Sequence, residues 1–398
     1  MRFCYSRLNS LLKTLEITDL DRFTPIQLVA NFCTLLATYT EGFRVLMQPH
    51  DERTPQISDP KLQLCCVDAS IAIRPVFERF RNVIITSGTL SPLEFYTKIL
   101  QFTPKVSESL TMQLSRKCIL PILLTKGSDQ MPVSSRYEMR NDASCIKNYG
   151  QLLVDLCANV PDGIVCFFTS YEYMEMVVSS WDKSDIINKI LAHKLVFVET
   201  KDVVETSTAL ECFKKACDCG RGGVFFSIAR GKVSEGIDFN NHYGRCVVMF
   251  GIPYQYTKSR ELQLRTHFLE TKYSVPQKDF VTFDALRQTS QCVGRVIRSK
   301  TDYGIMVFAD ARYGKYDKIK KLPPWIVAYL DNNHRDLSTD RAVSVCKQFL
   351  RDMGQPRSLK DEIGVTMYDR KQTEAYLRKH GYSTTYGGGF GANAKEEK

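Results

Sequence analysis

Five short, continuous apolar runs recur from residue 163 onward, and they constrain the fold more than any other feature of the chain. Stretches with helical spacing, such as 148–159 and 171–183, separate these runs. A strand that is apolar at every position is covered on both faces, as in a parallel sheet between helices. Ligands of such sheets bind beyond the carboxyl ends of the strands. The predicted strands are 163–168, 194–199, 223–228, 245–250 and 304–309.

The first 105 residues have a different pattern. Leucines recur at helical spacing between residues 8 and 15, and Thr24 followed by Pro25 starts a second predicted helix that Gly42 ends. Short β runs follow, the last of them at 82–86. We therefore predict a helical segment at 1–42, a β-containing region at 43–105, an α/β domain at 106–355 and a flexible tail at 356–398.

The net charge of +10 and the pI near 8.9 suit a polyanionic partner, although solubility alone explains them equally well. We see no apolar run long enough for a membrane span and no secretory signal, which indicates a cytosolic or nuclear protein. Fourteen cysteines in that setting are expected to be reduced. The densest group, Cys212, Cys217 and Cys219, lacks a second C-x-x-C, so incidental thiols are favoured over a zinc site.

The loop after the predicted strand 223–228 combines glycines, acids and bases. Its glycines permit close approach of the backbone, its serine can donate to a phosphate, and its acids can accept from a ribose or an arginine. A single loop of this kind is more often a solvated turn than a site. The residues in question are Arg230, Gly231, Lys232, Ser234, Glu235, Gly236 and Asp238.

A helical pattern that starts near Phe283 contains three long polar side chains, Gln291, Arg295 and Arg298. Their i, i+4, i+7 spacing predicts one stripe on a helix whose other positions are apolar and packed. Rigidly held guanidinium groups suit a γ-phosphate, whose developing charge they stabilise in phosphoryl transfer.

Hydroxyl-bearing residues follow two further apolar runs. Helix capping or a turn explains each segment as well as a binding role does. These residues are Ser87, Gly88 and Thr89 after 82–86, and Thr169, Ser170 and Tyr171 after 163–168.

Taken in order, the segments ITSGTLSP, FFTSYEYM, ARGKVSEGIDF and QCVGRVIR resemble motifs III to VI of the iron–sulfur superfamily-two DNA helicases of the XPD type. The likeness runs through residues 2–353. It implies a RecA-like second motor domain at 106–355, a remnant of the first motor domain at 43–105 and the end of an arch-like insertion at 1–42. It also implies an ATP-dependent 5′→3′ DNA helicase subunit of TFIIH that acts in the nucleus, in transcription initiation and nucleotide excision repair. DNA and the other TFIIH subunits, including the regulatory one, would be its partners, with no membrane.

The resemblance also implies roles for single residues. Arg295 and Arg298 would reach the γ-phosphate, supported by Gln291, while Glu235, Gly236, Asp238, Ser87, Gly88 and Thr89 would couple the nucleotide to movement and DNA. The implied DNA-binding residues are Thr169, Ser170, Tyr171, Arg230, Lys232, Tyr254 and Tyr256. For the two tyrosines 254 and 256, packing is an equally good explanation.

The chain departs from that family in lacking the G-x-x-x-x-G-K-[ST] loop and the D-E-x-H box, which hold ATP and Mg²⁺. The cysteines that bind the family's 4Fe–4S cluster would precede this chain, so none of its cysteines is assigned to a cluster. We therefore expect a fragment or shortened form without ATPase or unwinding activity of its own.

Two other functions stay open: an interaction module that docks the regulatory TFIIH subunit, and a sister iron–sulfur helicase in genome maintenance. Upstream coding sequence would distinguish the enzyme from the module. A basic, aromatic stretch also has two interpretations, a solvated loop or a surface for DNA or a partner. It comprises Arg312, Tyr313, Lys315, Tyr316, Lys318, Lys320 and Lys321.

Overall fold

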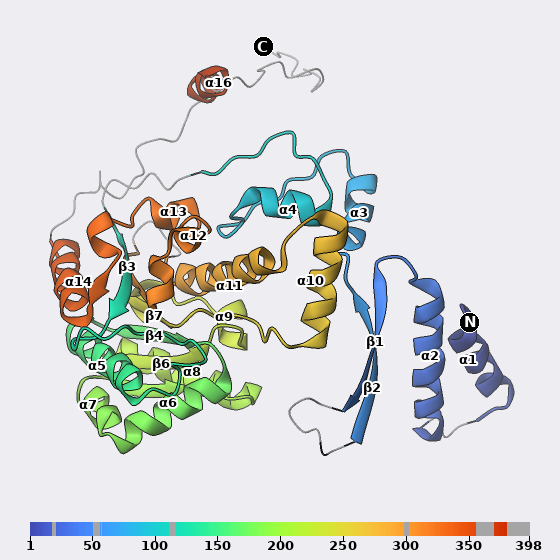
Figure 1. Cartoon of the computed structure of the whole chain (residues 1–398), viewed down its shortest axis with the longest axis horizontal. Helices are drawn as coiled ribbons and strands as arrows, with labels where there is room; N and C mark the ends of the chain where they lie inside the picture. The colour runs from blue at the N-terminus through green and yellow to red at the C-terminus, as the bar shows by residue number, and fades with distance from the viewer. Residues whose placement is uncertain are drawn as a thin grey trace, which may run out of the picture.

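The computed structural model describes residues 1–17, 21–50, 56, 58–110, 117–297, 302–355 and 370–379. Its centre is a parallel seven-stranded sheet in the order β5-β6-β4-β7-β8-β3-β9 (Figure 1). All five predicted strands are present. The sheet consists of β3 (Ile119–Lys126), β4 (Gly163–Phe168), β5 (Leu195–Val198), β6 (Gly223–Ile228), β7 (Cys246–Phe250), β8 (Gly304–Ala309) and β9 (Leu337–Ser338).

Successive residues of the central strands enter two different cores. In β4, Ile164, Cys166 and Phe168 pack on one face, while Val165 and Phe167 pack on the other. Because a strand points its side chains alternately to its two faces, a sheet covered twice needs apolar residues at every position. This confirms the α/β fold predicted from the continuous apolar runs.

Helices cover both faces of the sheet (Figure 1). One face is covered by α5 (Ala143–Asn159), α6 (Tyr171–Lys183), α7 (Ile186–His193) and α14 (Thr339–Met353). The other carries α8 (Val203–Asp218), α9 (Lys232–Gly236), α11 (Gln277–Val293), α12 (Tyr316–Ile319) and α13 (Pro324–Val327). Helix α10 (Arg260–Tyr273) lies between this domain and the N-terminal part of the chain (Figure 1).

The N-terminal part begins with the two predicted helices, α1 (Cys4–Thr14) and α2 (Thr24–Thr38). An antiparallel hairpin follows, formed by β1 (Phe43–His50) and β2 (Ser58–Cys66). Gly42 precedes the hairpin with φ +70°, and a Cβ there would lie 2.1 Å from Ile71 Cδ1. Only glycine fits this turn, both for its backbone angle and for the space available.

The predicted strand at 82–86 is wrong. These residues lie between α3 (Ser70–Arg79) and α4 (Leu93–Leu100) in irregular structure, and Ile84 is 89% exposed. A strand needs a neighbour for its backbone hydrogen bonds. Among the described residues no strand pairs with this segment, so its apolar side chains stay at the surface.

Within the range predicted as a flexible tail, α16 (Arg370–Lys379) is a helix. The remaining tail residues, 356–369 and 380–398, lie outside the described part of the chain. Nowhere in the described ranges is a helix both long and apolar enough to cross a bilayer.

Candidate functional site

A cavity of about 730 Å³ separates the N-terminal part of the chain from the end of α11. Ser87, Gly88 and Thr89 line it from one side, and Gln291 and Arg295 from the other. The structure thus brings together two predicted segments that lie about 200 residues apart. The other lining residues are Leu110, Arg287, Gln288, Ser290, Gly294, Ile297 and Trp325.

Gln291 and Arg295 do not lie on one α-helix, so the predicted helical stripe is wrong for these two residues. Helix α11 starts at Gln277 rather than near Phe283, and it ends at Val293. A 3₁₀ turn, Gly294–Val296, then carries Arg295, so only Gln291 lies on the α-helix. Glycine is a poor α-helix former and helix ends often tighten to 3₁₀, which accounts for the change. Arg298 lies outside the described residues.

Arg295 is held by the loop after β6. Its Nη1 lies 2.9 Å from Asp238 Oδ1, and the arginine side chain is only 16% exposed. A guanidinium carries its N–H donors in a rigid fork, so the bond to Asp238 fixes the orientation of the group. The two segments that the sequence placed separately therefore meet through a direct ion pair.

The backbone of the 231–238 loop is built differently from the expectation. Glu235 and Gly236 end the short helix α9; the Glu235 side chain lies outside the described part of the structure, and a Cβ on Gly236 would meet only open space. Ser234 is buried and donates to the Gly231 carbonyl at 2.7 Å. The idea that Ser234 donates to a phosphate is therefore wrong, since its hydroxyl stabilises the turn itself.

The 87–89 segment forms a tight turn. Ser87 Oγ accepts from the Thr89 amide at 3.2 Å and lies 3.2 Å from the Thr89 hydroxyl. The Trp325 indole donates to the Gly88 carbonyl at 2.7 Å, which ties this turn to α13. The exposed Ser87 hydroxyl and the Thr89 backbone thus face the same cavity as Arg295.

The segment after β4 combines a cap with a buried polar contact. Ser170 caps α6 by accepting from the Tyr173 amide at 3.2 Å, which is the helix-capping role considered for its hydroxyl. The Tyr171 hydroxyl donates to Glu199 Oε1 at 3.1 Å. Burial first, and then the Glu199 carboxylate, raise the pKa of Tyr171 to about 12. Tyr171 is therefore a neutral donor at physiological pH.

Arg230 points into the domain rather than to an open surface. Its Nη2 lies 2.7 Å from Asp284 Oδ2 on α11, and it also donates to the Pro253 carbonyl. Burial alone would raise the pKa of Asp284, but Arg230 and Arg287 more than offset this and lower it. Lys232 donates through its Nζ to the Lys201 carbonyl at 3.0 Å.

Two family models match the chain, a helicase C-terminal domain at residues 153–329 and a helical and beta-bridge domain at residues 1–42. The helicase subunit XPD of the general transcription and DNA repair factor IIH from Arabidopsis thaliana is 56% identical over 89% of this chain and 47% of its own length. The XPD/RAD3 subunit of that factor from Saccharomyces cerevisiae is 48% identical over 98% of the chain and 49% of its length. The chain belongs to the XPD-type helicases.

This member of the XPD-type helicases spans about half the length of the curated relatives that it matches. A solved XPD helicase structure superposes with a TM-score of 0.53 at 20% identity, covering 78% of this chain and 50% of that one. At that identity the likeness concerns the fold, a RecA-like parallel sheet between helices.

Eight of the fourteen cysteines of this XPD-type chain lie in its two hydrophobic cores. Across the described ranges no three His, Cys, Asp or Glu side chains gather as metal ligands. Burial raises the pKa of Cys157, Cys217 and Cys346 to about 12. All three thiols lie in the two hydrophobic cores, where they pack as small apolar side chains.

Tyr254 and Tyr256 differ in their surroundings in this XPD-type chain. Tyr254 is partly buried against the α11 face of the sheet, with the Arg312 guanidinium 5.7 Å from its ring centre. Tyr256 is 57% exposed. Thr169 lies beside the same edge, with its Cγ2 3.2 Å from where a Cβ on Gly251 would be. Stacking on a base therefore suits Tyr256 better than Tyr254.

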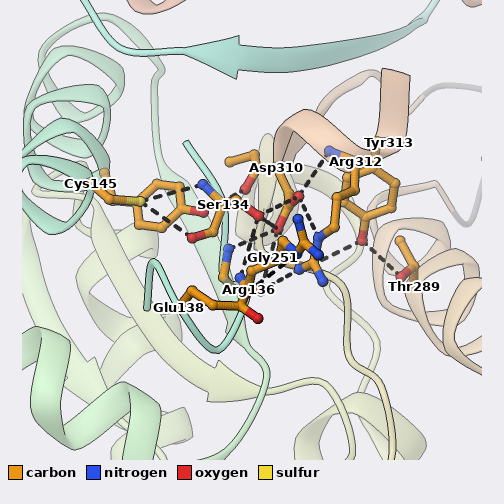
Figure 2. Close-up of polar contacts among 12 residues, drawn as sticks. Ser134, Arg136, Glu138, Cys145, Gly251, Thr289, Asp310, Arg312 and Tyr313 are labelled. Atoms are coloured by element: carbon orange, nitrogen blue, oxygen red, sulfur yellow. Dashed lines mark hydrogen bonds and ion pairs between the residues drawn. The ribbon is translucent and has the colours of Figure 1, made fainter. Parts of the chain in front are cut away.

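Sequence reasoning missed a buried polar knot around Asp310, which directly follows β8 (Figure 2). Asp310 is fully buried and accepts from Ser134 Oγ at 3.1 Å, from the Ser135 amide at 2.9 Å and from Arg312 Nη2 at 2.7 Å. Tyr313 beside it donates to the Gly251 carbonyl at 3.1 Å. The signal for it in the sequence is an acid directly after a predicted strand.

The basic, aromatic stretch of this XPD-type chain is neither one solvated loop nor one binding surface. Arg312 and Tyr313 belong to the buried knot, and Lys318 is buried beside Asp317. Lys321 pairs with Asp279 of α11 at 2.8 Å. Both predicted interpretations are therefore wrong for these four residues, and only Lys315, Tyr316 and Lys320 are exposed.

Proposed function

We propose that this chain supplies the arginine side of the motor in an ATP-driven DNA helicase, as the XPD subunit of TFIIH. In this proposal it translocates 5′→3′ along DNA during transcription initiation and nucleotide excision repair, in the nucleus. The names of the two XPD relatives and the helicase C-terminal domain support it. The remaining TFIIH subunits, including the regulatory one, are its proposed partners.

One observation carries the motor part of the proposal: Arg295 and the Ser87–Thr89 turn line one cavity, while Asp238 holds the guanidinium. A guanidinium fixed in a partly enclosed space can stabilise the charge that develops on a γ-phosphoryl group without first having to reorganise. Gln291, on the last turn of α11, supplies an amide to the same space. Arg298 is proposed as a second cation from the adjoining segment.

Coupling between the nucleotide and DNA would use the same loops. The 231–238 segment contacts the cavity-lining Arg295 through Asp238, and it contacts the carboxyl end of β5 through Lys232, whose amide donates to Glu199 at 3.1 Å. The 87–89 turn reaches the second domain through Trp325. A change in the cavity can therefore alter the DNA-facing edge through contiguous contacts.

The sequence contains no G-x-x-x-x-G-K-[ST] loop, so ATP and Mg²⁺ would be held mainly by another polypeptide segment. We expect the chain alone to release no phosphate from ATP, with or without single-stranded DNA. Robust phosphate release by the purified chain would overturn this part of the proposal.

The arginine role is tested by adding, as a separate polypeptide, the part of the Arabidopsis relative that this chain does not match. The wild-type chain should then restore DNA-dependent phosphate release, because an arginine finger acts in trans. Arg295→Lys keeps the charge but loses the fork of donors, and should lower the rate by about 10³-fold or more.

The control for this experiment is Arg351→Lys on the exposed surface of α14, which makes the same chemical change far from the cavity. It should leave the rate unchanged. If Arg295→Lys restores phosphate release as well as the wild-type chain does, the motor role of this arginine is refuted.

A further inference from the structure

Glu199 is a buried carboxylate at the carboxyl end of β5 that has no assigned role. It is 1% exposed, and its amide donates to the Phe226 carbonyl at 2.8 Å, which continues the pairing of β5 with β6. No described Lys, Arg or His forms an ion pair with it. A carboxylate buried without a cation is costly, so its hydrogen bonds must hold it.

Four donors from three different elements converge on this carboxylate. Oε2 accepts from the Ser227 hydroxyl at 2.5 Å and from the Ile228 amide at 3.3 Å, both at the end of β6. Oε1 accepts from the Tyr171 hydroxyl of α6 and from the Lys232 amide of α9, each at 3.1 Å. A carboxylate can accept all four bonds because it has two oxygens and no proton to place.

The approach of α9 to Glu199 is so close that it excludes a side chain. A Cβ on Gly231 would lie 2.5 Å from Oε1 and 2.8 Å from Oε2. The φ of Gly231 is −93°, an angle that any residue adopts, so the space and not the backbone angle requires glycine here. The lack of a side chain at Gly231 therefore allows the start of α9 to contact the Glu199 carboxylate directly.

The residues after Glu199 extend the contact to the surface. The Lys201 Nζ lies 5.7 Å from the centre of the Tyr171 ring, and the Lys201 carbonyl accepts from Lys232 Nζ at 3.0 Å. Both lysines are exposed. Two cations and an aromatic ring are thus held side by side at the carboxyl edge of the sheet, and single-stranded nucleic acid binds to such a combination through its phosphates and its bases.

We infer that Glu199 is a positioning residue for the binding of single-stranded nucleic acid. Its carboxylate fixes Tyr171 and the start of α9 relative to each other. Lys201, two residues further along the chain, then lies beside Tyr171 on the exposed surface. This inference rests on the proposed function. It adds two residues, Glu199 and Lys201, to the predicted DNA-binding edge. Glu199 itself, being buried, touches no ligand.

The test measures binding of fluorescein-labelled oligo(dT), about 20 nucleotides long, to the full chain by anisotropy at about 50 mM salt. Glu199→Gln removes a negative charge, so electrostatics alone would tighten binding. The positioning role predicts the opposite, about fivefold weaker binding, because an amide NH₂ then faces N–H donors that it cannot accept from.

The matched control is Glu205→Gln on α8, an exposed acid that accepts from the Thr200 hydroxyl at 2.8 Å and makes the same charge change. It should bind oligo(dT) as tightly as the wild-type chain or more tightly. Tyr171→Phe removes only the hydroxyl that donates to Glu199, and it should also weaken binding about threefold to fivefold. This second variant keeps the test valid if Glu199→Gln does not fold.

A double-variant cycle separates positioning from general destabilisation. The chain carrying both Glu199→Gln and Tyr171→Phe should bind no more weakly than the weaker single variant, since both changes break the same contact. If the wild-type chain binds oligo(dT) and both single variants bind equally well, the inference on Glu199 is refuted while the proposed DNA binding stands. If the wild-type chain itself does not bind oligo(dT), both the inference on Glu199 and the proposed DNA binding are refuted.

Discussion

At the scale of single residues, aspartate carboxylates orient several of the arginine side chains of this chain. Asp238 holds Arg295, Asp284 holds Arg230, and Asp310 holds Arg312. In a chain with 54 Lys and Arg residues, ion pairs thus hold three of the guanidinium groups in fixed orientations. Fixed groups suit recognition of phosphates, because less side-chain entropy is lost on binding.

The ion pair between Asp310 and Arg312 gives a direct test of how strongly a carboxylate holds a buried arginine in this chain. Asp310→Asn should lower the free energy of unfolding by about 3–5 kcal/mol, because Arg312 is left buried without its counter-ion. Urea unfolding followed by circular dichroism measures the change. Asp331→Asn, an exposed cap that accepts from the Asn333 amide at 2.9 Å, is the control and should cost about 1 kcal/mol or less. Equal losses for the two variants would refute the importance of the knot.

At the scale of elements, the contacts that join the N-terminal part of the chain to the second domain include three between distant segments. Asp68, after β2, accepts from Lys272 and Tyr273 of α10 at 2.7 and 2.8 Å. The Phe95 ring of α4 stacks on Phe283 of α11 with 4.3 Å between ring centres. The Trp325–Gly88 hydrogen bond is the third. None of these pairs could be predicted, because residues about 190 to 240 positions apart have no shared periodicity.

The Asp68 contact should depend on pH. Burial by itself would raise the pKa of Asp68, but the bonds from Lys272, Ser70 and Tyr273 lower it to about 2. A lowered folded-state pKa means that the stabilisation is complete above the unfolded-state pKa near 4 and is lost as the pH falls toward 2.

The pH dependence is measured as the difference between the wild-type chain and Asp68→Asn in urea unfolding. That difference should be about 2 kcal/mol at pH 7 and should shrink steadily between pH 4 and pH 2. A difference that stays constant over this range would contradict the assignment of the contact to an ionised carboxylate.

At the scale of the whole molecule, the cavity exists because the two parts of the chain are packed against each other. In Figure 1, α4 lies above α11 and beside the upper end of α10, and this packing places the 87–89 turn opposite Arg295. In the proposed motor the same junction must open and close, so its contacts set how easily the two parts separate.

Phe283→Leu should loosen this junction without unfolding the sheet. It removes the stacking with Phe95 and the edge contact with Tyr96, and should expose residues 43–105 to trypsin several-fold faster. Phe349→Leu on α14, also buried but in the opposite core, is the control and should not speed cleavage of that region. Mass spectrometry of the fragments distinguishes the outcomes, and equal cleavage in both variants would contradict the prediction.

Five of the seven strands of the sheet follow from the sequence alone, because a strand that is buried on both faces is apolar at every position. The sequence also located the loop after β6 that carries Asp238, and the segments that carry Ser87–Thr89 and Arg295. Tertiary structure alone decided that 82–86 is no strand, since pairing needs a neighbour that no local pattern supplies. It likewise decided the partners of Glu199 and Asp310, because the cost of burying a carboxylate depends on donors that distant segments bring to it.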